Sequence, residues 1–402
     1  MSEIKSTQLL KKHLHDYFQA FFPKSGPKPL VAWCTSVGPS EILTAMGFQV
    51  YYPENHGALL GATRASGDLI GSAHAMGYSQ EICSYLTSDI GSYLKKQTPL
   101  SKAYDIPGPP RPDLLVYATN QCHEVQDWFS FYAREWKVPI FGINFPWKID
   151  QVQKEHVTYV ATQFRALIDL CTKITSKTLD PQKLKAVVTE SAQTSKLWRT
   201  FLDTAKVTPS PMNFFDACIQ MAPAVVLRGL PVANQYYQTL NFEMEEKIKA
   251  NVAAVSGEQL RLYWDGMPIW GRLRYFADLF KDNKTCVVAS TYCSSWVFDN
   301  LSGDDPLNSM ALDYTKIFIN RSDAAKEKIL SELARDFLVD GFIFHDSKTC
   351  PYNSNSRFGL PQRLQQDYGI PSLVIDGDLC DLRCFSEEQT KTSLESFMEQ
   401  LR

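Results

Sequence analysis

The sequence lacks the patterns that mark membrane, secreted and nucleic-acid-binding proteins. No run approaches the roughly 18 consecutive apolar residues of a membrane-spanning helix. The charged, amphipathic N-terminal stretch has neither the apolar region nor the cleavage site of a secretory signal. Lysine and arginine are dispersed over a chain of net charge −3, which argues against nucleic acid or a membrane as partner. We therefore expect a cytoplasmic protein.

Phosphate-binding and hydrolase motifs are missing as well. There is no G-x-x-x-x-G-K-[ST] loop, no G-x-G-x-x-G after a strand and no G-x-S-x-G turn, so we expect this chain to bind no nucleotide itself. The ten cysteines include no C-x-x-C pair. Because cytoplasmic thiols stay reduced, the cysteines do not predict a disulfide framework. They are either buried hydrophobic residues or ligands that the fold brings together.

Runs of β-branched and aromatic residues alternate with stretches of helical periodicity, which is typical of an α/β fold. The strand runs are almost continuously apolar, which indicates parallel sheets covered on both faces. We predict four strands in the first part of the chain and four in the last. Their predicted ranges are 29–34, 48–53, 113–119, 139–145, 260–266, 285–291, 341–347 and 371–377.

The 402 residues are too many for one core of ordinary size, so we expect more than one domain. We predict an N-terminal α/β lobe over 1–150 and a C-terminal α/β lobe over 256–402, both Rossmann-like. The stretch 151–255 between them has helical periodicity and no convincing strand, and is predicted to be a helical connector. Within it, Ser210 or Asn213 is expected to cap a helix.

The two lobes resemble weak internal repeats. The stretch "RPDLLVYATNQC", which ends at Cys122, is similar to "VDGFIFHDSKTC", which ends at Cys350. Both cysteines follow the third predicted strand of their lobe. The carboxyl edge of an open parallel sheet is where such folds bind ligands. The pattern therefore predicts that both cysteines face one cleft between the lobes.

Cys83, Cys122 and Cys350 lie in polar loops or at helix starts, where backbone N–H groups stabilise thiolates. Three thiolates from distant segments suit a [4Fe–4S] cluster with one iron not bound by cysteine, whereas structural zinc ligands usually come in close pairs. The spacing alone leaves open that these cysteines are simply buried. The others divide into three that we expect to be structural, Cys171, Cys218 and Cys286, and four without a clear role, Cys34, Cys293, Cys380 and Cys384.

The stretch "PENHG" follows the second predicted strand and places Glu54, Asn55 and His56 at the ligand edge. A histidine in such a position can act as a proton donor. It can equally be a loop histidine with satisfied hydrogen bonds, and the sequence does not decide between the two.

Several stretches resemble the family that unites ATP-dependent benzoyl-CoA reductases with (R)-2-hydroxyacyl-CoA dehydratases, and the likeness runs over nearly the whole chain. The similarity is greatest to the larger active-site subunit of class I benzoyl-CoA reductase. The stretches that carry it are "CSYLTSDIG", "TNQCHEVQDWFSFYAREWKVP", "TPSPMNFF", "WDGMPIWGRLRYF" and "DGFIFHDSKTC".

The resemblance implies an iron–sulfur subunit that pairs with a paralogous second subunit. The family's cluster cysteines match Cys83, Cys122 and Cys350, and the cluster would be [4Fe–4S] or larger. A separate ATP-hydrolysing iron–sulfur activator, itself supplied indirectly by ferredoxin, would deliver low-potential electrons. An acyl-CoA would be the substrate, in a dry cleft that we expect to be lined by Trp33, Tyr85, Trp264 and Trp270.

Two activities are implied. The first expectation is reduction of an aromatic acyl-CoA, as in benzoyl-CoA reductase. The alternative is dehydration of an (R)-2-hydroxyacyl-CoA, with Ser36, Glu54 or His56 near the substrate hydroxyl. Two further hypotheses are a non-catalytic subunit that holds a cluster next to a catalytic paralogue, and an α/β protein without metal.

Overall fold

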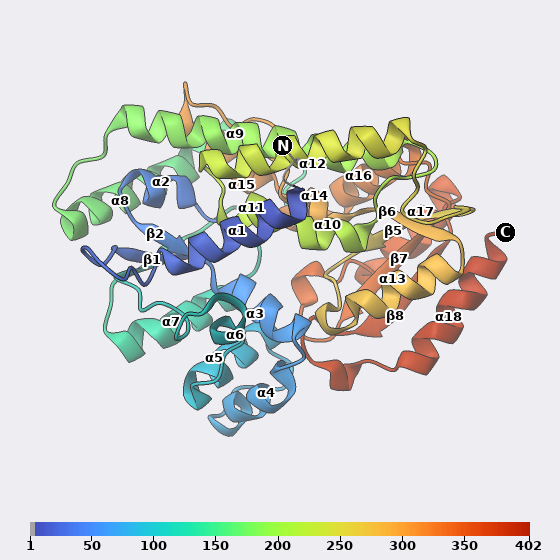
Figure 1. Cartoon of the computed structure of the whole chain (residues 1–402), viewed down its shortest axis with the longest axis horizontal. Helices are drawn as coiled ribbons and strands as arrows, with labels where there is room; N and C mark the ends of the chain where they lie inside the picture. The colour runs from blue at the N-terminus through green and yellow to red at the C-terminus, as the bar shows by residue number, and fades with distance from the viewer. Residues whose placement is uncertain (1–4) are drawn as a thin grey trace.

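The computed structural model describes residues 5–402 and consists of two α/β lobes, each built on a four-stranded parallel sheet (Figure 1). Every strand lies within the range predicted for it, so the α/β fold is confirmed. The N-terminal strands are β1 Val31–Cys34, β2 Gln49–Tyr51, β3 Leu114–Ala118 and β4 Ile140–Ile143. The C-terminal strands are β5 Leu260–Asp265, β6 Thr285–Ser290, β7 Gly341–Ser347 and β8 Ser372–Gly377.

The two sheets have the same strand order, β2-β1-β3-β4 and β6-β5-β7-β8. In each sheet the second strand lies on one side of the first strand, and the third and fourth strands lie on its other side. The strand order therefore reverses between β1 and β3 in the N-terminal lobe and between β5 and β7 in the C-terminal lobe. Such a reversal opens a crevice at the carboxyl ends of the two strands, because the connections leave toward opposite faces. Both lobes therefore offer a ligand site at equivalent places.

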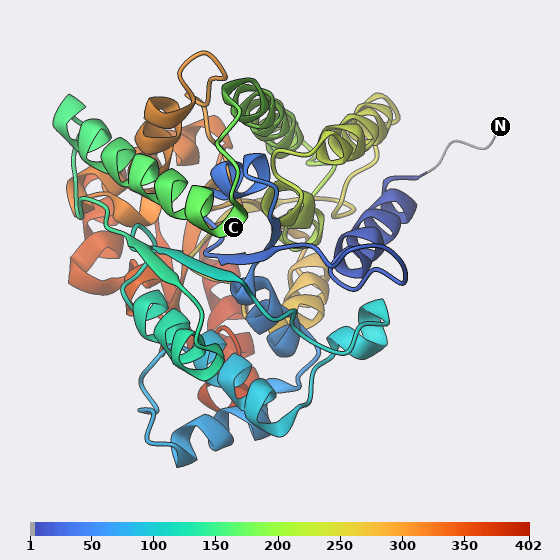
Figure 2. The same cartoon turned by 90° about the vertical axis from the view of Figure 1, so that its left-hand side faces the viewer.

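Helices cover both faces of the sheets, which explains why β1 and β5 are buried along their whole length. In Figure 2, α8 and α7 lie on opposite sides of the N-terminal strands. The helices of this lobe are α1 Ser6–Gln19, α2 Ser40–Ala45, α3 Pro53–Ala62, α4 Ser66–Ala75, α5 Ser84–Lys95, α6 Leu100–Tyr104 and α7 Glu124–Trp136. Those of the C-terminal lobe are α13 Leu273–Asp282, α14 Thr291–Ser294, α15 Pro306–Lys316, α16 Asp323–Asp336, α17 Leu360–Tyr368 and α18 Glu387–Gln400.

The stretch predicted as a connector holds five helices and, within the described residues, no strand. The pair α9 and α12 runs along one side of both lobes (Figure 1). Asn213 caps α10, since its side chain accepts a hydrogen bond from the Asp216 N–H. The boundaries of the three segments remain predictions. The helices are α8 Lys154–Thr175, α9 Pro181–Asp203, α10 Phe214–Gln220, α11 Ala222–Val226 and α12 Pro231–Lys249.

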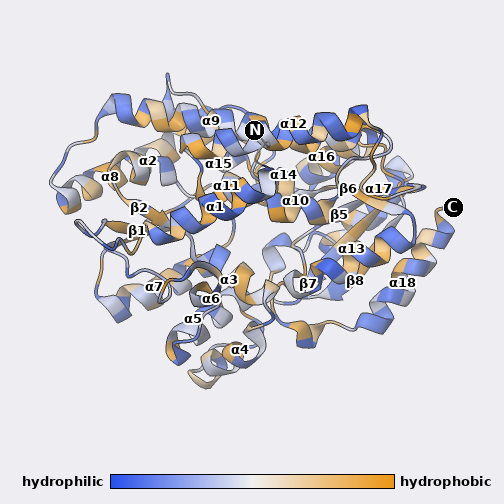
Figure 3. Ribbon diagram, viewed as in Figure 1, coloured by the Kyte–Doolittle hydropathy of each residue, from blue (hydrophilic) through white to orange (hydrophobic). Residues whose placement is uncertain are grey.

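One continuous cluster of buried side chains joins both sheets and the connector helices. Figure 3 shows the strands largely in hydrophobic colours, whereas the outer helices carry both colours, as expected for helices with one buried face. None of the helices within residues 5–402 combines the length and the apolar character needed to cross a membrane.

Candidate active site

Two adjoining cavities lie where the loops after the strands of both lobes meet. The first, here called the large cavity, has a volume of about 220 Å³, and the second, the cysteine cavity, about 90 Å³. They are separated by a shared wall to which both lobes contribute. The residues that line both cavities are Glu54, Tyr85, Gln121, Met267, Tyr292 and Trp296.

Cys83, Cys122 and Cys350 all line the cysteine cavity, although the sequence separates them widely. Each stands where a helix begins: Cys83 immediately before α5, Cys122 two residues before α7, and Cys350 immediately before the short 3₁₀ helix Pro351–Asn353. The structure thus brings Cys122 and Cys350 to one cavity, as their places in the repeat predict, and adds Cys83. The other seven cysteines, all within the described residues, do not line this cavity.

The electrostatics of the cysteine cavity favour a bound cation. Burial raises the pKa of the Cys83 and Cys122 thiols well above the usual range and that of Cys350 to about 12. The Cys350 thiol raises the pKa of both other thiols further, and the Cys122 thiol raises that of Cys83. A backbone N–H three residues further along, of Leu86, Val125 and Asn353 respectively, acts against this rise. Three thiolates in this space therefore require compensating positive charge, which iron or zinc provides.

The donor set around the cysteine cavity consists of three cysteine thiols. Within residues 5–402, no group of three or more histidine, cysteine or acidic side chains is placed closely enough to hold one metal ion. Cysteine thiolates that accept hydrogen bonds from backbone N–H groups are the ligands that iron–sulfur clusters use, so these residues fit such a group.

Asp378, which follows β8 and is fully buried, holds two cysteine-bearing segments together. One carboxylate oxygen accepts a hydrogen bond of 2.5 Å from Ser84 Oγ, next to Cys83. The other accepts bonds from the N–H and Oγ1 of Thr349, next to Cys350, at 2.9 and 2.5 Å. The contact joins the two lobes at the cysteine cavity. The sequence analysis missed Asp378, although an acidic residue just beyond a parallel strand is a usable signal.

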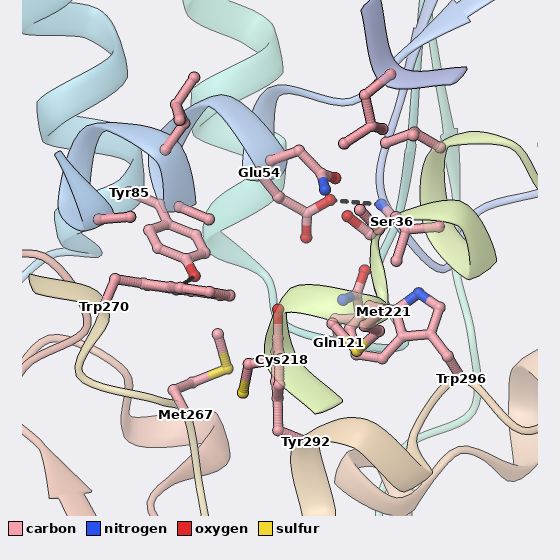
Figure 4. A pocket seen from close by; sticks show the side chains of 18 of the residues that line it. Ser36, Glu54, Tyr85, Gln121, Cys218, Met221, Met267, Trp270, Tyr292 and Trp296 are labelled. Atoms are coloured by element: carbon pink, nitrogen blue, oxygen red, sulfur yellow. Dashed lines mark hydrogen bonds between the residues drawn. The ribbon is translucent and has the colours of Figure 1, made fainter. Parts of the chain in front are cut away.

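The carboxyl, amide and serine side chains of the large cavity come from the N-terminal lobe (Figure 4). Glu54, in the first turn of α3, accepts a hydrogen bond from the Ser36 N–H in the loop after β1. Burial raises the pKa of Glu54, and the hydrogen bonds from Ser36 and Gln121 act against that rise. A half-buried carboxyl with a raised pKa is suited to general acid–base work.

Arg228 fixes the loop that presents Ser36. Its guanidinium is 3% exposed and donates to the carbonyl oxygens of Ser36 and Gly38 at 3.1 and 3.0 Å. The same group pairs with buried Glu41 at 2.9 Å, so its charge is compensated. Arg228 lies just after α11 in the connector, and no pattern in the sequence pointed to it.

The walls of the large cavity are apolar and aromatic. Tyr85 and Trp270 were expected to line the cleft and do so, and the Trp270 indole N–H donates to the Tyr85 hydroxyl. The close fit needs glycine on α3, because a β-carbon at Gly57 would lie 2.8 Å from the Tyr85 ring. Cys218 also lines this cavity and is buried in the core, so its structural role stays a prediction.

Trp33 and Trp264 do not line either cavity, contrary to expectation. Both are fully buried one position before the end of a strand, Trp33 in β1 and Trp264 in β5. Their side chains pack between sheet and helices, and the indole N–H groups donate to the Pro110 and Met267 carbonyls. Among the described residues, none within a strand lines either cavity, which is why these predictions were wrong.

His56 belongs to a buried network rather than to a cavity wall. Its Nδ1 lies 2.5 Å from Asp89 Oδ1 and its Nε2 lies 2.9 Å from Thr98 Oγ1. Asp89 also accepts hydrogen bonds from Trp128 and Tyr132, so the network joins α3, α5 and α7. The structure thus gives His56 the satisfied hydrogen bonds of the simpler interpretation and brings it to neither cavity, whereas Ser36 and Glu54 lie together.

A doubly wound α/β chain with an enclosed site of this kind is an enzyme subunit. It belongs to the family described as 2-hydroxyglutaryl-CoA dehydratase, D-component, which it matches over residues 35–401. The lactoyl-CoA dehydratase subunit alpha of Anaerotignum propionicum is 30% identical over 92% of this chain and 90% of its own length. The (R)-2-hydroxyisocaproyl-CoA dehydratase alpha subunit of Clostridioides difficile is 28% identical over 99% and 97%.

A reductase is found among the relatives as well. One benzoyl-CoA reductase subunit of Thauera aromatica is 26% identical over 90% of this chain and 86% of its own length. The family resemblance is thereby confirmed, and the enzyme is of dehydratase or reductase type. Each of these relatives is named as one subunit of an enzyme.

Proposed function

We propose that the chain is the alpha-type catalytic subunit of an (R)-2-hydroxyacyl-CoA dehydratase. The observation that carries the proposal is the shared wall, in which the Glu54 carboxyl lies between a largely apolar cavity and three converging cysteines. The names of the relatives support it, because dehydratase alpha subunits at 30% and 28% identity precede the reductase subunit at 26%. This reverses the order in which the two activities were expected from the sequence.

The cofactor would be a [4Fe–4S] cluster held by Cys83, Cys122 and Cys350, with one iron left for another ligand. The cluster would supply low-potential single-electron chemistry. The residues themselves offer a ready set of thiols in a partly enclosed space. The absence of a P-loop suits electrons that come from a separate ATP-hydrolysing activator, and thus indirectly from ferredoxin, and a paralogous second subunit would complete the enzyme.

The dehydration removes the hydroxyl group from C2 and a proton from C3, and releases enoyl-CoA and water. Glu54 would move protons at the reacting carbons, since burial raises its pKa above the usual carboxyl value and so favours proton uptake. The Ser36 N–H fixes the orientation of that carboxylate. Trp270, Tyr292 and Trp296 exclude water, which strengthens polar interactions inside the cavity.

Reduction of an aromatic acyl-CoA is the second candidate. It is favoured by the benzoyl-CoA reductase relative and by the aromatic walls, which would accept a planar ring. The two reactions differ in electron demand, because dehydration returns its electron in each turnover and ring reduction consumes two.

The test starts from anaerobic purification of the chain with its partner subunit, followed by iron and sulfide analysis. Roughly four irons per chain are expected. The activated enzyme is then given 2-hydroxyacyl-CoA thioesters with a trace of reductant. Enoyl-CoA in large excess over the reductant supports the dehydratase. In a parallel assay with benzoyl-CoA, a ring-reduced product limited to half the electrons supplied supports the reductase. A complex without iron, or one that binds no acyl-CoA, contradicts both.

A further inference from the structure

The large cavity is lined by uncharged side chains, with the carboxyl of Glu54 as the one exception among the described residues. Among residues 5–402, no lysine, arginine or histidine lines it or the cysteine cavity, and Glu54 is the only carboxyl on the walls of the large cavity. The other polar side chains, Ser36, Asn55 and Gln121, gather with Glu54 near the shared wall. The rest of the lining, from α1, α3, α11 and the loops of the C-terminal lobe, is aliphatic or aromatic.

A carboxylate on the acyl group would find no counter-charge among the described residues of this cavity. Burying a charge without a counter-charge is strongly unfavourable, and the carboxyl of Glu54 would add repulsion. Relatives of this chain carry names with acidic, aliphatic and aromatic acyl groups, namely 2-hydroxyglutaryl, lactoyl and phenyllactyl, so the family alone does not fix the class.

The volume indicates a bulky acyl group. A cavity of about 150 Å³ lined by apolar residues is enough to hold benzene, and the large cavity has about 220 Å³. Three aromatic rings follow one another along its wall: Trp270 and Tyr292 have centroids 5.9 Å apart, and Tyr292 and Trp296 5.3 Å apart. Rings at such angles accept the edge or face of a further ring. A methyl group would leave much of this space unfilled.

We propose that this site selects neutral 2-hydroxyacyl groups with a branched aliphatic or aryl side chain, and rejects acyl groups that carry a second carboxylate. The inference deepens the proposed function and rests on it. The reacting carbons lie against the polar shared wall, and the side chain of the acyl group fills the apolar remainder of the large cavity.

The test measures binding rather than turnover, in the anaerobic complex without reductant. The probes lack the 2-hydroxyl group and do not react: 3-phenylpropanoyl-CoA, 4-methylpentanoyl-CoA, propanoyl-CoA and glutaryl-CoA. We expect the first two to bind at least about tenfold more tightly than propanoyl-CoA, since each buried methylene is worth about 10- to 200-fold. Glutaryl-CoA is expected to bind most weakly of the four in isothermal titration calorimetry.

A charge placed in the cavity should invert this preference. Met221 lines the large cavity (Figure 4), so Met221→Lys is expected to tighten glutaryl-CoA at least tenfold relative to 3-phenylpropanoyl-CoA. Ile219→Lys, at a 58% exposed position two residues away, is the matched control and should leave both affinities unchanged. Met221→Leu keeps the cavity apolar and should retain the wild-type order if the site tolerates substitution there.

The outcomes separate the inference from the proposed function. Glutaryl-CoA or propanoyl-CoA as the tightest ligand overturns the inference and leaves an acyl-CoA enzyme in place. Binding of none of the four probes by an iron-loaded complex overturns the proposed function. An unchanged preference in a folded Met221→Lys variant shows that the acyl side chain lies elsewhere, which also overturns the inference.

Discussion

The two lobes share one strand order but contribute different chemistry. In the N-terminal lobe the loops after the first three strands carry polar, reactive side chains. In the C-terminal lobe the equivalent segments carry mainly apolar and aromatic side chains, and the polar exceptions that line the cavities are Ser295, Cys350 and Asn353. The residues that occupy these positions are Ser36, Glu54 and Cys122 after β1, β2 and β3, and Met267, Tyr292 and Cys350 after β5, β6 and β7.

This comparison shows which features of a doubled fold persist and which diverge. The end of the first strand is alike in both lobes, with a buried tryptophan one position before the last residue. The third loop keeps its cysteine in both. The segments after the first two strands differ between the lobes: those of the N-terminal lobe form the reactive wall of the site, and those of the C-terminal lobe form its hydrophobic wall. The two equivalent crevices therefore contribute different chemistry to one site.

The largest effect is expected from the cysteines, because both lobes must supply them. Cys83→Ala, Cys122→Ala and Cys350→Ala should each lower iron and sulfide to background, since three ligands of a cluster cannot be reduced to two. Cys171→Ala, a fully buried cysteine of α8, should retain the metal. Equal iron content in all four variants would refute the assignment.

The division between reactive and hydrophobic walls is tested by Glu54→Gln against Tyr292→Phe. Glu54→Gln should lower kcat by about 10²- to 10⁴-fold while iron is retained, because the general acid–base group is lost. The pH limb due to Glu54 should lie above the usual carboxyl range, since its pKa is raised, and should vanish in the variant. Tyr292→Phe should change kcat less than tenfold. Comparable losses in both would contradict the division.

Asp378 has no counterpart after β4 and binds the lobes together. Asp378→Asn should lower the free energy of unfolding by about 3–5 kcal/mol, because an amide N–H₂ would face the hydrogen-bond donors Ser84 and Thr349. The rate at which iron is lost to a chelator should rise. Asp376→Asn, on the exposed face of β8, is the matched control and should stay within about 0.5 kcal/mol. Equal effects would mean that Asp378 has no special role.

The smallest effect concerns the last residue of the first strand, which is Cys34 in one lobe and Asp265 in the other. Burial raises the pKa of Asp265 to about 6, so the folded protein binds its proton more tightly than the unfolded chain. This contribution to stability is complete below about pH 4 and is lost as the pH rises through 6, about 3 kcal/mol in all.

Asp265→Asn should therefore flatten the dependence of stability on pH between 4 and 6, measured by denaturant unfolding. Cys34→Ala should leave the slope in this range unchanged, because burial moves the pKa of that thiol far above it. An unchanged slope in Asp265→Asn would show that this carboxyl does not titrate there.

The sequence predicted the strands well because parallel strands buried on both faces are short, apolar and bounded by turns. The cysteine cavity could be predicted because Cys122 and Cys350 occupy equivalent places in a repeat. The direction of individual side chains could not be predicted. Trp33 points into the core and His56 points toward Asp89, because helices that are distant in the sequence pack around these residues. The role of Arg228 could not be predicted for the same reason, since it contacts the loop that carries Ser36 from another segment of the chain.

The position of the three cysteines has a consequence for how the protein keeps its shape. A group bound by Cys122 and Cys350 closes a loop of more than half the chain, and closing long loops can be worth about 5 kcal/mol. A group bound by these thiols would thus cross-link the N-terminal and C-terminal lobes and stabilise the folded protein. Loss of the bound group to oxygen or a chelator should then appear first as a lower melting temperature and faster proteolysis, which makes the integrity of the site readable without any substrate.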